Sequence, residues 1–537
     1  MAKRIGVIDC ETDPFKEGRI PAPFIWGFYS NEHGQLYFDT TLELVDFIAA
    51  LDNYRVYGHY AGKFDFHFML FAIPNWEKII MINGRIAQFY ISDTELCDSY
   101  CIIPAPLSAY QKTKIDYALF EPDVRHLHMP EIKAYLADDC LFLFELVNAF
   151  IDEHGYSLTI ASAAIKKLQK IEGIKIEELG RPHYEAMLPY YYGGRVQCFQ
   201  KGIIEGDITY LDINSAYPYA MKHKHPWGSF FKTRQLNPEI QGHNFYTFTA
   251  KSKGAFPWRN EEGALQFPAD GLTREFSVTG WEVMAAIDLG LAEDLKHIEQ
   301  MEFFEQKDFS KYVDYFYMIK CTAPKDSPEY IFAKLFLNSA YGKFAANPEK
   351  YSDTFLCDQA DIGKVLAEGF SIHGEIHHRF IISKPNDPDT WRHYNIATGA
   401  SITGFVRAYL LRAIESVENP IYCDTDSVIF TGRHSLSLSD DLGAWKVEGE
   451  FKRGGIGGKK IYALEDDLYR PLLAKAKTEK ELKEANKHAK HACKGLRLDH
   501  DDVLKVCGGA VISKTPDNPI FSLKRGIYFQ EKTIRMT

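Results

Sequence analysis

Hydrophobic and acidic residues alternate in the first part of the chain at spacings that predict particular elements. Ile5 to Thr12 has the pattern of a strand, in which every second residue shares a face, so Asp9 and Glu11 are expected to point the same way. Tyr135 to Phe150 is apolar at helical spacing and carries Asp139 one turn after Tyr135. The patterns predict an α/β unit with acidic side chains on a strand and on a helix.

A second acidic pair interrupts an apolar, β-branched run from Ile421 to Phe430. Asp424 and Asp426 are one residue apart, and on a strand they would share a face. Adjacent carboxylates repel each other and are costly to bury unless a divalent cation neutralises them. A hairpin that holds two such side chains over an open face is therefore expected to bind metal, although a bare Asp-x-Asp is more often a solvated turn.

Another apolar strand, Tyr210 to Ile213, carries a third carboxylate near its end. It delivers Asp212, after which Asn214, Ser215 and Pro218 break the strand and begin a helix. We expect this carboxylate to complete a site for two metal ions.

The helix predicted around Lys334 carries polar residues on one face. Lys334, Asn338 and Tyr341 fall at i, i+4 and i+7, which makes a continuous stripe that Gly342 closes. A cation, an amide and a phenol are suited to bind a triphosphate and a base, whereas a helix face packed in the hydrophobic core would carry apolar residues. Carboxylates for two metals and a lysine for phosphates are what nucleotidyl transfer requires.

These three segments stand in the order of a known set of motifs. Asp-x-x-Ser-x-Tyr-Pro from Asp212, Lys-x-x-x-Asn-Ser-x-Tyr-Gly from Lys334 and Tyr-x-Asp-Thr-Asp-Ser from Tyr422 resemble motifs A, B and C of the family B DNA polymerases. Residues 338–348 look like the protein-primed subgroup of bacterial viruses and linear plasmids, and residues 9–27 are similar to its tectivirus-like members. Matches cover most of the chain, and three motifs in order are specific where one would be weak.

The resemblance implies a multidomain fold of α/β and α+β type, with a ribonuclease-H-like exonuclease domain followed by a right-hand polymerase domain of palm, fingers and thumb. The expected domains are the exonuclease at 1–160, a linker with the first part of the palm at 161–224, a first insertion at 225–309, the fingers at 310–345, a second insertion at 346–395, the palm at 396–494 and the thumb at 495–537. In the subgroup, the first insertion contacts the priming protein, and the second encloses the template and aids strand displacement.

The resemblance also implies roles for the polymerase residues. Asp212 and Asp426 would be the main ligands of two Mg²⁺ ions, with Asp424 assisting, Ile213 in the same ligand set and Mn²⁺ as an alternative metal. Residues expected to bind the dNTP are Ser215, Tyr217, Lys320, Lys334, Asn338 and Tyr341. Tyr217 would lie under the sugar and exclude a 2′-hydroxyl, and Lys325 is a rival to Lys320. Residues expected to contact DNA are Ser99, Leu107, Tyr191, Gly193, Gly194, Thr403, Arg407, Lys460 and Tyr462.

In the first unit the acidic residues resemble the three exonuclease motifs of proofreading polymerases. The implied ligands of a second pair of metal ions are Asp9, Glu11, Asp65 and Asp139, and the other implied catalytic residues are Tyr135 and Lys112. One departure concerns an asparagine that the family carries four or five residues before the second aspartate. Tyr60 and Ala61 stand there, so weaker proofreading and stacking of Tyr60 on the frayed strand are both open.

Composition agrees with several domains and with a charged partner. At 537 residues the chain is too long for one hydrophobic core. The net charge of −11 alone argues against nonspecific nucleic-acid binding, but residues 451–537 carry 19 Lys and Arg against 11 Asp and Glu, which is +8 and leaves −19 elsewhere. A basic C-terminal part is able to grip phosphates, although Lys475 to Lys494 is also typical of a solvated helical face.

The ten cysteines are scattered without a Cys-x-x-Cys pair, which disfavours a zinc site and indicates a reducing compartment. The chain shows no run of membrane-spanning length and no signal-peptide hydrophobic region after Met1. We expect a protein of the cytoplasm, in a host cell if viral, without a membrane partner and monomeric apart from a heterodimer with its priming protein.

The predicted function is therefore a DNA-directed DNA polymerase, a nucleotidyltransferase with 3′–5′ exonuclease proofreading. It would start from a hydroxyl of a separate terminal protein, elongate with dNTPs on template and primer DNA, and replicate a linear viral or plasmid genome. A primer-independent family B polymerase would share every motif. A DNA-binding scaffold without activity would be expected to lose acids, yet all seven are present, and a nuclease alone would not need motifs B and C.

Overall fold

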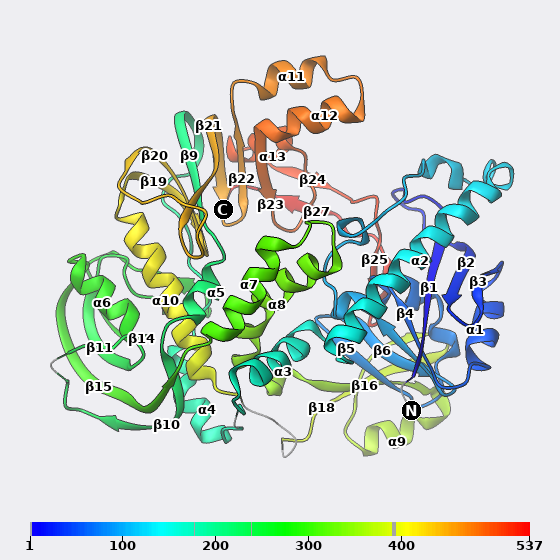
Figure 1. The fold of residues 1–537 in the computed structure, drawn as a ribbon, viewed down its shortest axis with the longest axis horizontal. Coiled ribbons are helices and arrows are strands. Elements are labelled where there is room, and N and C mark those ends of the chain that lie inside the picture. The colour runs from blue at the N-terminus through cyan, green and yellow to red at the C-terminus, as the bar shows by residue number, and fades with distance from the viewer. Residues whose placement is uncertain (1–2, 177, 238, 389–393) are drawn as a thin grey trace.

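The computed structural model describes residues 3–537 except 177, 238 and 389–393. Three large β-sheets, with helices packed between and around them, organise the molecule (Figure 1). Within the described residues, no helix has the length and hydropathy needed to cross a membrane. All ten cysteines are free thiols.

The N-terminal sheet is mixed and contains ten strands. In spatial order these are β17 (Ser371–Ile376), β18 (Arg379–Pro385), β16 (Ser352–Asp358), β5 (Lys78–Ile82), β6 (Arg85–Ile91), β7 (Thr94–Asp98), β4 (Tyr54–Gly58), β1 (Arg4–Thr12), β2 (Pro23–Ser30) and β3 (Gly34–Phe38). β4 runs parallel to both β1 and β7, and the other neighbours are antiparallel. The long helix α2 (Met129–His154) packs against β1 and β2 through its apolar face, so the expected α/β unit is confirmed.

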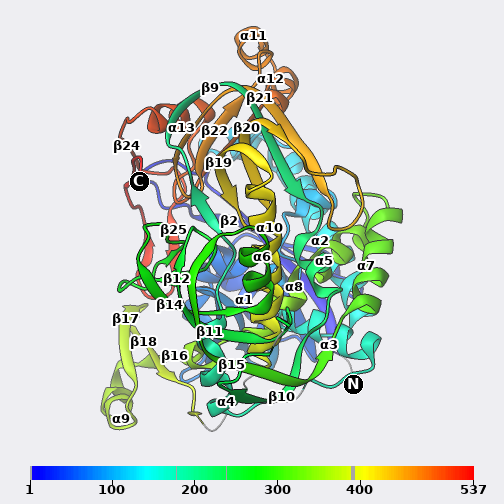
Figure 2. The same cartoon turned by 90° about the vertical axis from the view of Figure 1, so that its left-hand side faces the viewer.

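This sheet is not complete at residue 160, where the sequence placed the end of the first unit. β16, from the second predicted insertion, pairs with β5 and so extends the N-terminal sheet by three strands. Figure 2 shows β17, β18 and the short helix α9 (Ile362–Ala367) at the far end of this extension. The end of the insertion includes residues 389–393, which lie outside the described residues.

The central sheet is antiparallel and contains seven strands. Their order is β23 (Ala489–Cys493), β22 (Ile461–Glu465), β21 (Trp445–Gly458), β9 (Gly202–Ile213), β20 (Ser427–His434), β19 (Val417–Asp424) and β8 (Val196–Cys198). Helix α10 (Ile396–Ile414), most of whose residues are buried, packs against α5 (Ala216–Met221) and beneath β20. The apolar run from Ile421 to Phe430 thus forms parts of two paired strands, the hairpin that the sequence predicted.

The first predicted insertion folds as a separate four-stranded antiparallel sheet. Its order is β10 (His225–Thr233), β15 (Ala292–Lys307), β11 (Phe245–Ser252) and β14 (Thr273–Thr279). Helix α6 (Gly280–Asp288) joins this sheet to α10.

Two packed helices, α7 (Ser310–Thr322) and α8 (Pro328–Phe344), follow the first insertion. Ser327 caps α8 by accepting a hydrogen bond from the Tyr330 N–H, and Pro328 occupies the first turn, as helix starts favour. The helix expected around Lys334 is therefore confirmed. Helix α3 (Ile160–Glu172) packs on both α7 and α8.

The C-terminal part adds three helices and two small hairpin-like sheets. The helices are α11 (Tyr469–Lys475), α12 (Glu479–Ala485) and α13 (His500–Cys507). β24 (Ile512–Lys514) pairs with β27 (Lys532–Ile534), and β25 (Ile520–Ser522) pairs with β26 (Gly526–Tyr528). The chain therefore returns to the N-terminal unit, because Leu523 belongs to its core.

Candidate active sites

The first acidic site lies between β1 and α2. One carboxylate oxygen from each of Asp9, Glu11 and Asp139 lies within 4.8 Å of the other two. The strand places Asp9 and Glu11 on one face, as the alternation predicted, and α2 brings Asp139 across from them. Asp65, at the start of a short 3₁₀ turn, is 2% exposed and lines the same cavity.

Burial is the main influence on the charges of this site. It raises the pKa of Asp9 and of Glu11 well above the usual range, and the neighbouring carboxylates add to the effect. The pKa of Asp65 is raised to about 6, again chiefly by burial. One oxygen each of Asp65 and Asp139 is buried without a hydrogen-bond partner. Buried carboxylate oxygens without a hydrogen-bond partner are suited to bind a divalent cation, whose charge would offset the free-energy cost of removing them from water.

Lys112 and Tyr135 both reach this cluster. The Lys112 ammonium pairs with Asp139 and lies 4.9 Å from the centre of the Tyr135 ring. The Tyr135 hydroxyl lies 3.1 Å from that of Tyr117. The structure thus brings together all six residues that the sequence assigned to the hydrolytic site.

A cavity of about 570 Å³ opens over the carboxylates. Aromatic side chains of Phe15, Tyr60 and Phe64 line it beside the acids. Residues 518–521 also line it, and Phe521 packs edge-on against Phe64 with ring centres 5.0 Å apart. Sequence reasoning missed this C-terminal contribution, and no local pattern signals it, because the contact joins residues more than 450 positions apart.

The departure at Tyr60 and Ala61 has a clear geometry. Ala61 is fully buried, so its side chain is not able to reach DNA. Tyr60 has a positive φ of 63° and leaves 47% of its surface exposed at the cavity. The Arg85 guanidinium stacks 4.6 Å from its ring centre, and Tyr100 meets it edge-on at 5.0 Å. Of the two residues, only Tyr60 presents a face for a base.

The second acidic site lies where β9 meets the β19–β20 hairpin. Asp212 is the penultimate residue of β9, and Ser427 of β20 is directly opposite it. Asp424 ends β19, whereas Asp426 lies in the two-residue turn after Thr425, whose φ is 63°. The expectation that both acids share one face of a strand is therefore wrong in detail: the turn, not strand alternation, orients Asp426.

The backbone fixes this hairpin against β9. The Ile213 N–H donates to the Asp426 carbonyl at 2.8 Å, and the Thr425 N–H donates to the Arg195 carbonyl at 2.7 Å. A Cβ on Gly194 would lie 2.8 Å from the Thr425 side chain, so only glycine allows the linker to approach this closely.

The three carboxylates differ in charge environment. Burial, Asp426 and Glu448 raise the pKa of Asp212 to about 7, and burial with Asp424 raises that of Asp426 to about 6. Asp424 is instead held by Lys460, whose Nζ lies 2.8 Å from Oδ2. Raised pKa values at Asp212 and Asp426 mark them as the pair that a divalent cation would relieve most.

The residues expected to bind the nucleotide line this site. Lys320 Nζ donates to Ser215 Oγ at 2.8 Å, whereas Lys325 lies in the loop after α7, so the geometry favours Lys320. The rings of Tyr217 and Tyr341 are stacked, with centres 4.0 Å apart and an interplanar angle of 4°. Lys334 and Asn338 are exposed on the same face of α8 as Tyr341, as the stripe predicted.

The residues expected to contact DNA divide into two groups. Tyr191, Gly193, Gly194 and Lys460 are exposed or half-buried around the hairpin, and Tyr462, which is 8% exposed, packs against Tyr422 and Tyr210. Ser99, Leu107, Thr403 and Arg407 are buried. Direct contact of these four side chains with DNA, which the sequence suggested, does not fit the structure.

Their partners explain why they are buried. Ser99 Oγ lies 2.9 Å from His59 Nδ1, and Thr403 Oγ1 donates to the Ala400 carbonyl within its own helix. Arg407 forms a fully buried ion pair with Glu282 at 2.8 Å and donates to the carbonyls of Tyr192 and Gly193. It holds the linker in place from inside the protein.

Sequence reasoning missed three charged residues near Asp212. Glu448 lies at a bulge of β21 and raises the pKa of Asp212, after burial and Asp426, while Lys490 and Lys446 lower it. Lys490 Nζ lies 3.3 Å from Glu448. None of the three belongs to a motif: the register between β9 and β21 places Glu448 and Lys446, and the pairing of β23 with β22 places Lys490.

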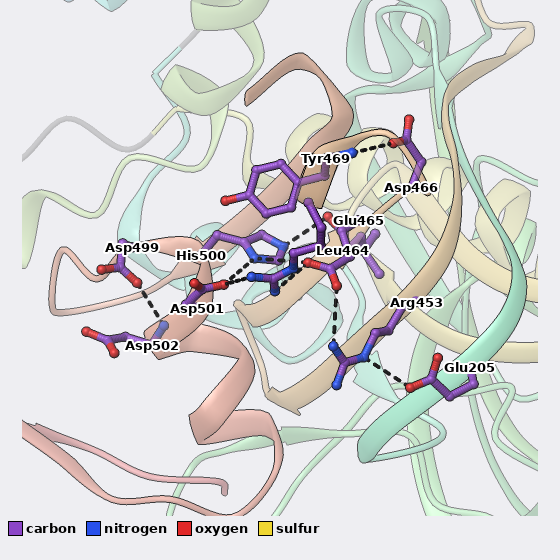
Figure 3. A network of polar contacts seen from close by, with 11 residues as sticks. Glu205, Arg453, Leu464, Glu465, Asp466, Tyr469, Asp499, His500, Asp501 and Asp502 are labelled. Carbon is purple, nitrogen blue, oxygen red and sulfur yellow. Dashed lines mark hydrogen bonds and ion pairs between the residues drawn. The ribbon is translucent and has the colours of Figure 1, made fainter. Parts of the chain in front are cut away.

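A further carboxylate cluster lies between β22, α11 and α13, as Figure 3 shows. Oxygens of Glu465 and Asp501 and the Nδ1 of His500 are close enough to hold a cation. The Arg470 guanidinium already lies 2.6 Å from each of the two carboxylates, and Arg453 lies 3.5 Å from Glu465. Arginine therefore neutralises this cluster, which ties the C-terminal helices to the central sheet.

A family model described as DNA polymerase type B, organellar and viral, matches residues 108–428. The chain is 36% identical to a DNA-directed DNA polymerase of Enterobacteria phage PRD1, over 99% of this chain and 98% of that one. It is 28% identical to a DNA polymerase of Bacillus phage phi29, over 74% and 73% of the two chains.

Among solved structures, the chain resembles Phi29 DNA polymerase in its ternary complex with primer-template DNA and incoming nucleotide substrates. The TM-score is 0.75 over all of both chains, at 17% identity. The resemblance that the motifs indicated is confirmed, and so is the expected multidomain fold.

Proposed function

Because the chain belongs to the organellar and viral type B DNA polymerases and is a DNA-directed DNA polymerase, we propose that Asp212, Asp426 and Asp424 hold two Mg²⁺ ions for nucleotidyl transfer. The observation that carries the proposal is the meeting of Asp212 and the acidic hairpin, with the pKa of Asp212 and Asp426 raised to about 7 and about 6. When bound, the ions would activate the primer 3′ oxygen and offset charge on the leaving pyrophosphate. Ile213, the last residue of β9, donates its N–H to the Asp426 carbonyl and belongs to the same proposed ligand set.

The surrounding side chains support a role for each in placing the nucleotide. In the reaction, the primer 3′ oxygen forms a bond to the α-phosphorus while the bond to the bridging oxygen breaks and pyrophosphate leaves. Lys320, which Ser215 orients, and Lys334 would neutralise the triphosphate, with Asn338 beside them. Tyr217 would lie under the sugar and Tyr341 against the nascent pair, so their stacked rings would part when a nucleotide enters.

Around the β19–β20 hairpin, exposed residues would contact DNA directly, and buried residues would support them. Lys460 and Tyr462 are proposed to hold the primer end, and Tyr191, Gly193 and Gly194 to approach the template. Ser99, Leu107, Thr403 and Arg407 would act by fixing the backbone of these segments, since their side chains are buried.

The first carboxylate site is proposed to remove nucleotides from a 3′ end by phosphodiester hydrolysis. Asp9, Glu11, Asp65 and Asp139 would hold two further Mg²⁺ ions, which orient and activate a water. Lys112 and Tyr135 would position the cluster and the water. The gathering of three carboxylates within 4.8 Å, beneath a cavity with aromatic walls, supports this assignment.

We further propose that synthesis begins on a hydroxyl of a separate terminal protein, which docks on the four-stranded sheet of the first insertion. On that sheet Phe231 and Phe304 are 42% and 66% exposed, and the centres of their rings lie 5.5 Å apart. The second insertion would enclose the template, α7 and α8 would act as fingers, and the C-terminal segment as thumb. The enzyme would act as a monomer, or as a heterodimer with the terminal protein, on a linear genome in the cytoplasm of a host cell.

One assay separates these initiation modes. Incorporation of a labelled dNTP is measured with template and a DNA primer, with template and a candidate terminal protein, and with template alone. The proposal expects extension of the primer and covalent labelling of the terminal protein. Efficient synthesis on template alone would instead identify a primer-independent polymerase.

A further inference from the structure

Lys446 lies on the same face of the central sheet as Asp212. It is the second residue of β21, and it is directly opposite Asp212 in the antiparallel register of β21 and β9. Residues that face each other across two antiparallel strands project to the same side. The Lys446 side chain therefore lies beside Asp212, the carboxylate that β9 contributes to the proposed polymerising site.

Two other lysines, one on α7 and one on α8, approach the same side of this site. Lys320 of α7 donates to Ser215, three residues after Asp212, and Lys334 is exposed on α8. Burial lowers the pKa of Lys320, and the charges of Lys334 and Lys446 lower it further, so both of these lysines are close enough to Lys320 to repel it. Lys320 of α7 therefore has two other cations near it, Lys334 of α8 and Lys446 of β21.

Lys446 lies near Asp212 and lowers the pKa of that carboxyl group, but it differs from three other lysines of the sheet and its turns in forming no ion pair with any described residue. Lys452 of the same strand pairs with Asp207, Lys460 with Asp424 and Lys490 with Glu448. Lys446 is exposed, and among the described residues none forms an ion pair with it. Cations that repel each other and that no ion pair neutralises favour an anionic ligand.

We propose that Lys446 is a third phosphate-contacting lysine, which binds the terminal phosphates of the incoming nucleotide and the pyrophosphate formed from them. This role rests on the proposed nucleotidyl transfer at Asp212. The triphosphate would extend from the half-buried Asp212 outward to the exposed Lys446, with Lys320 and Lys334 on its other side. No motif of the sequence includes Lys446, and only the strand register reveals it.

The test is single-nucleotide incorporation on a DNA primer and template with Lys446→Gln, Lys446→Arg and Lys452→Gln. Losing one charge-assisted contact of about 1.5 kcal/mol is expected to raise the KM for dNTP about tenfold in Lys446→Gln. The kcat should change less than the KM does. Lys446→Arg keeps the charge and should stay near the wild type, and so should Lys452→Gln, the control on the same strand.

Pyrophosphorolysis, the reverse reaction, provides the second readout. The KM for inorganic pyrophosphate should rise in Lys446→Gln to a similar extent, which a purely structural role in the strand would not produce. Unchanged KM values for both dNTP and pyrophosphate in a folded, active Lys446→Gln variant would overturn the proposal for this residue alone. A wild-type enzyme that extends no primer would overturn the proposed transfer mechanism, and this role with it.

Discussion

The two carboxylate sites of this chain differ in how far their ligands are already assembled. At the proposed hydrolytic site, oxygens of Asp9, Glu11 and Asp139 lie within 4.8 Å of one another beside a cavity. At the polymerising site, no such triplet is formed by the described residues, and Asp424 is held by Lys460. Both sites are acidic, but in the described part of the chain only the first has three carboxylates already close enough to share a metal ion.

The elements that carry the ligands explain the difference. β1 and α2 pack on each other through a buried core, which fixes three carboxylates before any ligand arrives. The acids of the proposed polymerising site lie at strand ends and in a turn, opposite helices that carry the residues proposed to bind the nucleotide. We infer that hydrolysis uses a preorganised site, whereas the transfer site is completed when its substrates enter.

The largest effect is expected from Asp426→Asn, which removes one ligand of the proposed transfer metals. Incorporation of dNTP should fall by about 10³-fold or more, because metal stabilisation of the transition state provides several kcal/mol. Degradation of single-stranded DNA should persist, since its ligands lie in another unit. The control is Asp207→Asn, which changes an exposed carboxylate of β9 that pairs with Lys452 on the neighbouring strand. Primer extension at near wild-type rate would contradict the assignment of Asp426.

The reciprocal change is Asp9→Ala with Asp65→Ala. Degradation of single-stranded DNA from its 3′ end should fall by a similar factor of about 10³, while primer extension survives. Asp46→Ala, on the exposed face of the helix at Thr41–Ala49, is a matched control. Persistent degradation in the double variant would place the hydrolytic site elsewhere.

A smaller effect is expected from Tyr217→Val at the polymerising site. If the ring under the sugar excludes a 2′-hydroxyl, the preference for dNTP over rNTP should fall by about 5- to 150-fold, the factor for a steric conflict of about 1–3 kcal/mol. Tyr217→Phe keeps the ring and should keep the preference. Incorporation of a single dNTP and the matching rNTP measures the ratio. Unchanged discrimination in an active Tyr217→Val variant would assign this role to another residue.

The smallest expected effect concerns the stability of the metal-free protein. Burial raises the pKa of Asp65 to about 6, from an ordinary value of about 4. A raised folded pKa stabilises the protein below the unfolded pKa, and that stability is lost as the pH rises through 6. Asp65→Asn should therefore raise the Tm in EDTA at pH 8 by about 1–4 °C, and the gain should vanish near pH 4. An equal gain at both pH values would mean that charge burial is not its cause.

Local pattern was enough to predict some of this molecule. The alternation in β1, the stripe on α8 and the order of the acidic motifs all follow from short stretches of sequence, and the structure has them as expected. The hairpin was expected, but the positive φ of Thr425 that turns Asp426 was not.

The features that sequence did not predict depend on contacts between distant segments. β16 extends the N-terminal sheet through backbone pairing with β5, which leaves no motif. The sequence predicted a DNA contact for Arg407, whereas its side chain pairs inside the protein with Glu282, 125 residues away. Residues 518–521 reach the hydrolytic cavity in the same way. Burial and register are properties of the whole fold, and single motifs do not encode them.

Mn²⁺ binding to the DNA-free protein, measured by calorimetry, tests most directly whether one site is preorganised and the other is not. The account predicts that the wild type and Asp426→Asn bind Mn²⁺ with similar stoichiometry and affinity, and that Asp9→Ala with Asp65→Ala loses the tight binding. Loss of that binding in Asp426→Asn, or its persistence in the double variant, would contradict the account.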